Sequence, residues 1–178
     1  LTGELPPELG TGGVRVTAKK TAVTTRVPTV QVIDVSNNKF SGGIPDEWGN
    51  IPQLTELRAV NCGLTGKLPA TIRDWQRISI IRLANNQLSG VIPDFYAGSL
   101  REFVIDNNRF TGALPASFSQ APVLRTLSAA NNRLTLIPNL ATSGRLDTVR
   151  LDSNRLEFGS LEPIRAIFFQ ANGQDSIP

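Results

Sequence analysis

The residues that could carry acid–base or nucleophilic chemistry are few in this sequence. It contains no His, which excludes a His-based catalytic triad, an imidazole general base and the common zinc sites. Its single thiol, Cys62, would act as a nucleophile only if it were exposed beside a base. Asp46 and Glu47 are adjacent in a turn, whereas a glycosidase needs two acids facing each other across roughly 5 to 10 Å. We therefore predict a protein that is not an enzyme and that holds no metal and no cofactor.

The composition narrows the remaining function classes. Charged residues make up 19% of the chain and hydrophobic residues 40%, which argues against disorder. The formal net charge of +3 is a mild excess, without the clustered basic stripe that nucleic-acid binding requires. No apolar run is long enough to span a membrane. The expected partner is a protein or a glycan, with no nucleic acid and no membrane insertion in this segment.

One unit recurs at steps of 22 or 24 residues, and such a period predicts a solenoid. Its six copies begin at Val30, Leu54, Ile78, Leu100, Leu124 and Leu146. Each copy contains an alternation of apolar residues, which is typical of a short strand. The predicted strands lie near residues 32 to 36, 56 to 60, 80 to 84, 102 to 106, 126 to 130 and 148 to 152.

The ninth position of the unit is nearly always Asn. Its residues are Asn38, Cys62, Asn86, Asn108, Asn132 and Asn154. An Asn amide offers two donors and an acceptor, so a stacked column of them would satisfy backbone groups at each turn of the coil. At this place Cys62 is expected to be a buried, inert thiol.

The unit reads L-x-x-L-x-L-x-x-N-x-L and continues as FSGGIP, LTGKLP, LSGVIP or FTGALP. This pattern resembles the plant-type leucine-rich repeat family over roughly residues 30 to 158. The resemblance implies an α/β repeat fold, a curved right-handed parallel β-solenoid with short 3₁₀ or helical turns on its convex side. The fifth copy lacks the Gly and the sixth lacks I-P, so we expect the coil to change or end there. We expect four aromatic residues after the prolines to fill the space between the layers: Trp48, Trp75, Phe95 and Phe118.

We predict a single leucine-rich repeat domain over residues 1–178. Residues 1–29 would form a half-repeat with an irregular insertion, residues 30–158 six repeats, and residues 159–178 a C-terminal cap. The sequence opens inside a repeat, which leads us to expect a piece of a longer protein. The insertion at 10–29 is interpreted either as a cover for an open sheet edge or as a binding protrusion.

The closing stretch suggests an origin. From Ile137 it runs to LDSNRLEFGSLEP at residues 151–163, which resembles the end of repeat arrays in bacterial surface and secreted proteins. The chain also has no N-x-Ser/Thr triplet and only one Cys, whereas plant receptor ectodomains usually carry several such triplets and paired cysteines. Both absences favour a bacterial product.

The third, fifth and seventh positions of each strand point away from the core. They form a mixed patch of charged and apolar residues, as is typical of interface centres. The predicted partner-binding residues are Glu56, Arg58, Ile80, Arg82, Glu102, Val104, Asp106 and Arg150. The same residues would also suit an ordinary soluble β-surface.

Two classes of function remain. The first is a recognition module of a cell-surface or secreted protein, located at the cell surface or outside the cell and binding through the concave sheet. The second is a structural spacer or adhesion segment of a larger surface protein, or a fragment of a plant-type receptor ectodomain.

Overall fold

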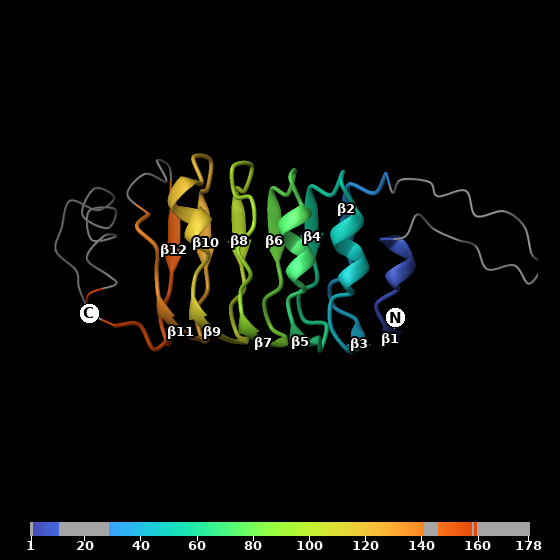
Figure 1. The fold of residues 1–178 in the computed structure, drawn as a ribbon. Coiled ribbons are helices and arrows are strands. Elements are labelled where there is room, and N and C mark those ends of the chain that lie inside the picture. Colours follow the sequence, from blue (N-terminus) through green and yellow to red (C-terminus); the bar gives the residue numbers. More distant parts are fainter. Residues whose placement is uncertain (1, 11–28, 141–145, 158, 160–178) are drawn as a thin grey trace, which may run out of the picture.

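The protein is a stack of short parallel strands, as a computed structural model shows for residues 2–10, 29–140, 146–157 and 159 (Figure 1). The predicted parallel β-solenoid is confirmed. Residues 11–28 of the predicted insertion at 10–29, and residues 160–178 of the predicted cap at 159–178, lie outside the described residues. Within the described part of the chain, no helix is long and apolar enough to cross a membrane.

The first sheet contains one three-residue strand from each of the six repeats. In order these are β2 (Val32–Asp34), β4 (Glu56–Arg58), β6 (Ile80–Arg82), β8 (Glu102–Val104), β10 (Thr126–Ser128) and β12 (Thr148–Arg150). All neighbours are parallel, and equivalent positions of adjacent repeats are paired. Because the register never slips, each repeat position becomes a straight column across the sheet.

A second sheet lies along the L-x-G-x-I-P extension and was not predicted from the sequence. It contains β5 (Thr65–Lys67), β7 (Gln87–Val91), β9 (Arg109–Ala113) and β11 (Arg133–Leu136), while β1 (Thr2–Glu4) pairs separately with β3 (Lys39–Ser41). We expected one strand per repeat, because a Gly in the middle of a segment indicates a turn. The pairing of β11 with β9 shifts register between Leu134 and Leu136, in the copy that lacks the Gly. The expected change in the coil is therefore visible at the fifth repeat.

Short 3₁₀ helices form the convex side. They are η1 (Pro7–Leu9), η2 (Asp46–Asn50), η3 (Ala70–Asp74) and η4 (Ala116–Gln120). Each is preceded by a proline, extended before η1, η2 and η3 and with φ −51° and ψ 135° before η4, and the fixed φ of proline suits the entry into the turn. Indole hydrogen bonds tie successive turns together, since Trp48 Nε1 donates to Pro6 O at 2.9 Å and Trp75 Nε1 to Trp48 O at 2.8 Å.

The core fills the space between these layers. The four aromatic residues expected there are all buried: Trp48, Trp75, Phe95 and Phe118. The rings of Phe95, Phe103 and Phe118 also contact one another, with centroids 5.0 to 6.1 Å apart. These aromatic side chains therefore hold the coil together and do not form a ligand platform.

The ninth-position amides satisfy backbone groups between repeats. Asn86 Oδ1 accepts from the backbone N–H groups of Cys62 and Leu64, at 3.1 and 3.0 Å. Its Nδ2 donates to the carbonyls of Ala59 and Leu83, at 2.7 and 2.9 Å. One side chain therefore joins two consecutive coils where the chain leaves the strand and no sheet partner exists.

The same pattern recurs in later repeats, with one exception. Three amides each accept from the eleventh residue of the preceding repeat and donate to its sixth: Asn108, Asn132 and Asn154. Cys62 replaces only the donor, through Sγ to Val35 O at 3.1 Å. Because the thiol sulfur is only a weak acceptor, the backbone N–H of Phe40 donates instead to the backbone carbonyl of Cys62, at 2.8 Å.

Replacing Asn86 with Ala should lower the free energy of unfolding by about 1–3 kcal/mol, because buried backbone groups would lose their partners. Gln87→Ala, at the exposed next position, is the matched control and should change the free energy of unfolding by less than about 0.5 kcal/mol. Urea midpoints of the two variants test this. Equal midpoints would contradict the role of the amide.

The glycines of the second sheet allow a test of backbone strain against packing. Gly66 and Gly112 have φ of +79° and +75°, so Ala should cost roughly 1 kcal/mol of strain at either site. A Cβ at 66 would contact nothing within 4 Å, whereas at 112 it would lie 3.1 Å from Val91 Cγ1. Gly112→Ala should therefore lower the Tm more than Gly66→Ala.

Adding Val91→Ala to Gly112→Ala should remove the extra loss in Tm relative to Gly66→Ala, because the opposing methyl group of Val91 is gone. If the double variant remained as destabilised as Gly112→Ala, contact with Val91 would not be the cause.

Candidate functional site

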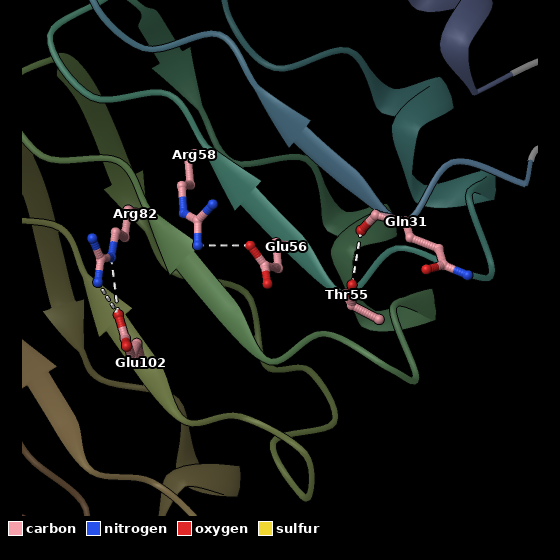
Figure 2. A network of polar contacts seen from close by, with 6 residues as sticks. All are labelled: Gln31, Thr55, Glu56, Arg58, Arg82 and Glu102. Atoms are coloured by element: carbon pink, nitrogen blue, oxygen red, sulfur yellow. Dashed lines mark hydrogen bonds and ion pairs between the residues drawn. The ribbon is translucent and has the colours of Figure 1, made fainter.

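The candidate site is the outward face of the first sheet, between β2 and β8. Because the strands are in register, its third and fifth positions form two adjacent columns. Apolar and charged side chains alternate in the third-position column, whereas the fifth-position column holds three charged residues followed by Val104; Figure 2 shows Glu56, Arg58, Arg82 and Glu102 among the charged ones. Of the six side chains at the third and fifth positions of β4, β6 and β8, Arg82 is exposed and the other five are half-buried. The sheet therefore offers a shallow platform made of side chains from three neighbouring strands.

Two ion pairs occupy the centre of this face (Figure 2). Arg58 Nη2 lies 2.7 Å from Glu56 Oε2, and both residues belong to β4. Arg82 reaches across to β8 instead, where its Nη2 and Nε lie 2.5 and 2.9 Å from Glu102 Oε2. Each guanidinium thus has one carboxylate, so the four charges balance and the centre carries no net charge.

Apolar side chains surround the ion pairs. Val32 on the edge strand is 49% exposed, whereas Ile80 and Val104 are half-buried. Ile80 lies between Glu56 and Glu102 in the third-position column. A partner would therefore meet apolar and charged groups side by side.

The seventh-position side chains serve mainly the sheet itself. The Asp106 carboxylate accepts from Ser128 Oγ at 2.7 Å and from the backbone N–H of Ala130 at 2.8 Å. Ser36 Oγ likewise accepts from the backbone N–H of Val60 at 3.1 Å. Asp106, which was predicted to bind a partner, is thus already engaged within the protein.

Arg150 lies apart from the other predicted residues. It is exposed on β12, and β10 separates it from β8. The intervening residue in its column, Ser128, is buried. The structure therefore brings together six of the eight predicted residues on β4, β6 and β8, engages Asp106 internally and leaves Arg150 separate.

A second column of amides borders the face and was missed in the sequence. The eighth-position residues have φ between 54° and 59°, and they are Asn37, Asn61, Asn85, Asn107, Asn131 and Ser153. Side-chain hydrogen bonds join neighbouring repeats, because Asn61 donates to Asn37, Asn107 to Asn85 and Asn131 to Asn107. Asn is among the few residues that adopt this left-handed conformation readily. The signal was present as repeated Asn-Asn doublets, of which only the second member was interpreted.

Asp34 is a further charged residue of this face, outside the predicted set. The backbone N–H of Ser36 donates to Asp34 Oδ1 at 3.0 Å, and this bond is the main cause that lowers the pKa of Asp34. The Ser36 hydroxyl lowers this pKa further, desolvation opposes it, and the Arg58 guanidinium makes the smallest contribution, which also lowers it. Asp34 therefore stays ionised at neutral pH and marks the edge of the face with a negative charge.

Catalytic arrangements do not appear on this surface. Among the described residues, no group of three or more His, Cys, Asp or Glu side chains could hold a metal ion. Cys62 is buried below the sheet, in the position expected for an inert thiol. What the face can do is make hydrogen bonds and apolar contacts to another molecule.

Comparison with known proteins gives the family. Residues 29–51 and 99–121 match the family described as Leucine Rich Repeat. Receptor-like protein 9a of Arabidopsis thaliana is 37% identical over 136 residues, which are 74% of this chain and 15% of that relative. The chain is a plant-type leucine-rich repeat protein. Its repeat array spans only 11% to 15% of the length of the curated relatives it matches.

Solved structures of receptors contain similar arrays. The crystal structure of a TDR receptor has a TM-score of 0.74 and 27% sequence identity, covering 87% of this chain and 25% of that one. The Arabidopsis receptor kinase HAESA, solved with the peptide hormone IDA and the co-receptor SERK1, has a TM-score of 0.71 and 26% identity over 88% of this chain and 28% of its own. The resemblance of the closing stretch to bacterial arrays stays a prediction, because much of that stretch lies outside the described residues.

The pKa of Asp34 provides a test of the face in solution. Since its folded value is lowered, Asp34 contributes stability that is present above the usual Asp pKa and is lost as the pH falls through the folded value. Ser36→Ala should raise the Asp34 pKa part of the way, because the hydroxyl is lost while the backbone N–H remains. Ser36→Thr is the control. A ¹³C NMR titration of the carboxyl group measures both, and an unchanged value in Ser36→Ala would contradict the assignment.

Proposed function

We propose that this chain is a non-catalytic recognition module that binds a protein partner on the face formed by β4, β6 and β8. The proposal includes an extracellular or cell-surface location, as part of a protein longer than this array. The kinase activity named for one relative, the receptor-like kinase TMK2 of Arabidopsis thaliana, is a property of that protein and does not enter the proposal.

One contrast between repeat positions carries this proposal. The inward and turn positions repeat with little variation, and they are buried or hydrogen-bonded. The third and fifth positions together hold a different pair of side chains in each of β4, β6 and β8 (Glu and Arg, Ile and Arg, Glu and Val), although their backbones are in register. A surface that differs at each step can select a partner in one alignment, which identical steps cannot do.

A protein partner is favoured over a glycan by the side chains present. Glycan sites commonly stack sugar rings on exposed aromatic side chains, whereas the aromatic residue of these three strands, Phe103, is buried and points away from the face. Arg beside apolar side chains is instead typical of the centres of protein interfaces. The structural neighbour HAESA, solved with a peptide hormone and a co-receptor, supports the same choice.

The proposal is tested by mapping binders, which does not require the natural partner to be identified first. Random peptides displayed on phage are selected on the wild-type chain and then measured against the double variant Arg58→Glu with Arg82→Glu. We expect most selected peptides to lose about tenfold or more in affinity, because the reversed charges repel Glu56 and Glu102 and remove the cationic donors. Arg73→Glu is the control, since Arg73 is 73% exposed on η3 of the convex side.

Two outcomes would contradict the proposal. If the selected peptides lost affinity for Arg73→Glu and not for the double variant, the binding surface would be convex. If no peptide distinguished the variants, the array would act as a spacer within a longer protein, which is the alternative function.

A further inference from the structure

We infer that a linear polysaccharide bearing carboxylate groups binds along the second sheet, over three exposed arginines that recur from repeat to repeat. These are Arg109, Arg133 and Arg155, and we call them the arginine stripe. The inference goes beyond the proposed function, because the stripe follows the second sheet and not the face formed by β4, β6 and β8.

The stripe arises from the period of the sequence, since its members occupy the tenth position of the last three copies. Arg109 begins β9 and Arg133 begins β11, and each is exposed while the residue after it is buried. Arg155 continues the pairing after β11, because its backbone N–H donates to Leu134 O at 2.9 Å. The three residues therefore follow one another along the edge of the array that carries the second sheet (Figure 1).

The pairing of the second sheet sets the interval between these arginines. Ser89 lies opposite Arg109 and Thr111 lies opposite Arg133, so neighbouring repeats are offset by two residues. Successive arginines are thus one strand and two residues apart, which lowers the repulsion between like charges compared with direct opposition. The stripe presents one cation per repeat, and this suits a polymer whose charge also repeats.

The stripe differs from other arginines of the chain in lacking acidic partners among the described residues. Elsewhere in the described part, four arginines have a carboxylate oxygen within 4.0 Å: Arg58, Arg73, Arg82 and Arg125. By contrast, the Arg109 side chain donates only to Gln87 Oε1, at 3.2 Å. Within the same residues, the side chains of Arg133 and Arg155 have no hydrogen-bond or ion-pair partner. Their N–H donors are therefore available to an anion.

The columns on either side of the stripe hold mainly amides and hydroxyls. The eighth-position column is the column of amides described above, and the twelfth-position column consists of Ser41, Thr65, Ser89, Thr111, Thr135 and Glu157. Glu157 is the one acid in these two columns, which together with the stripe leaves a formal charge of +2. Asp106 and Asp152 lie beyond the amides, on the outward face of the first sheet, and the Asp106 carboxylate is bonded there to Ser128 and Ala130.

A carboxylated sugar chain matches both parts of this surface. The planar fork of a guanidinium pairs with a carboxylate through two parallel hydrogen bonds. Amides and hydroxyls both donate and accept, as the hydroxyls of a sugar do. The amides are also held in place, because Asn107 donates to Asn85 at 2.7 Å and Asn131 to Asn107 at 2.9 Å. The exposed Val91, opposite Thr111, can contact the C–H groups of a sugar ring.

Two other polyanions fit this surface less well. Single-stranded nucleic acids stack their bases on aromatic side chains, and the eighth, tenth and twelfth positions of the six copies contain none. An extended acidic peptide points successive side chains in opposite directions, so it needs an acid at every second residue to meet the stripe. A chain of uronic acid units carries a carboxylate on every unit.

The test uses a hexamer of β-1,4-linked mannuronic acid as the probe, with β-1,4-mannohexaose as its uncharged match. Titration calorimetry should show binding of the hexamer and none of mannohexaose or of the single sugar acid, because each exposed ion pair is weak and several must form together. Raising the salt concentration from about 50 to about 200 mM should weaken binding about tenfold, as three ionic contacts predict.

Replacing one arginine of the stripe with Gln should weaken binding of the hexamer about threefold, and replacing all three about thirtyfold: Arg109→Gln, Arg133→Gln and Arg155→Gln. The control triple variant loses the same charge at exposed arginines outside the second sheet: Arg73→Gln, Arg77→Gln and Arg101→Gln. It should weaken binding less than about twofold, because distant exposed charges are screened. Both triple variants should keep the wild-type Tm, since the replaced side chains are exposed.

Three outcomes would overturn the inference. Equal losses in the two triple variants would mean that net charge alone attracts the hexamer. Stronger binding of hexaglutamate or of hexathymidylate at the same salt concentration would exclude a sugar chain as the preferred ligand. Binding of mannohexaose as strong as that of the hexamer, or no binding of either, would remove the role of the carboxylates.

Competition separates this site from the face formed by β4, β6 and β8. Peptides selected on that face should bind together with the hexamer. If they displaced it from the wild-type chain, the hexamer would lie on the first sheet, which would overturn the stripe and leave the proposed function intact. If no peptide could be selected while the hexamer still bound, the proposed function would be overturned and the stripe supported.

Discussion

The whole coil depends on one hydrogen-bonding arrangement, in which an amide at the ninth position serves the backbones of two consecutive repeats. Each coil of about 24 residues contributes only short strands to the two sheets, three residues to the first and three to five to the second, so backbone groups at the turns need other partners. Asn86 supplies both acceptor and donors from one buried position. These bonds add to the strand pairing in holding neighbouring coils together; between the first two repeats Cys62 supplies only the donor, and the register of β2 with β4 is the same.

The register in turn determines the character of the outward face. Side chains from different repeats become neighbours at the spacing of the strands. The contacts that an outward side chain makes therefore depend on the adjacent repeat as much as on its own. Arg82 illustrates this, because its carboxylate partner belongs to the next repeat, whereas Arg58 finds its partner on its own strand. A single substitution in one repeat thus changes the chemistry available in two.

The features that recur in every repeat could be predicted from the sequence. The six strands of the first sheet, the buried aromatic residues and the convex turns follow from the period, because core packing imposes the same residue types on every coil. The second sheet was missed because Gly66, Gly90 and Gly112 indicate turns, whereas here their positive φ lies within the paired strands. Likewise, Asp106 could be assigned to the outward face, but its bonds to Ser128 and Ala130 depend on distances that no spacing rule contains.

The placement of Trp48 and Trp75, whose indoles each donate to a backbone carbonyl of the preceding turn, has a spectroscopic consequence. They are the two tryptophans of the chain, and both lie in the convex turns of the first two full repeats. Intrinsic fluorescence therefore reports on the N-terminal end of the array, whereas circular dichroism averages over its length. Since a linear array can lose its coils from either end, a fluorescence transition that precedes or follows the dichroism would reveal which end unravels first.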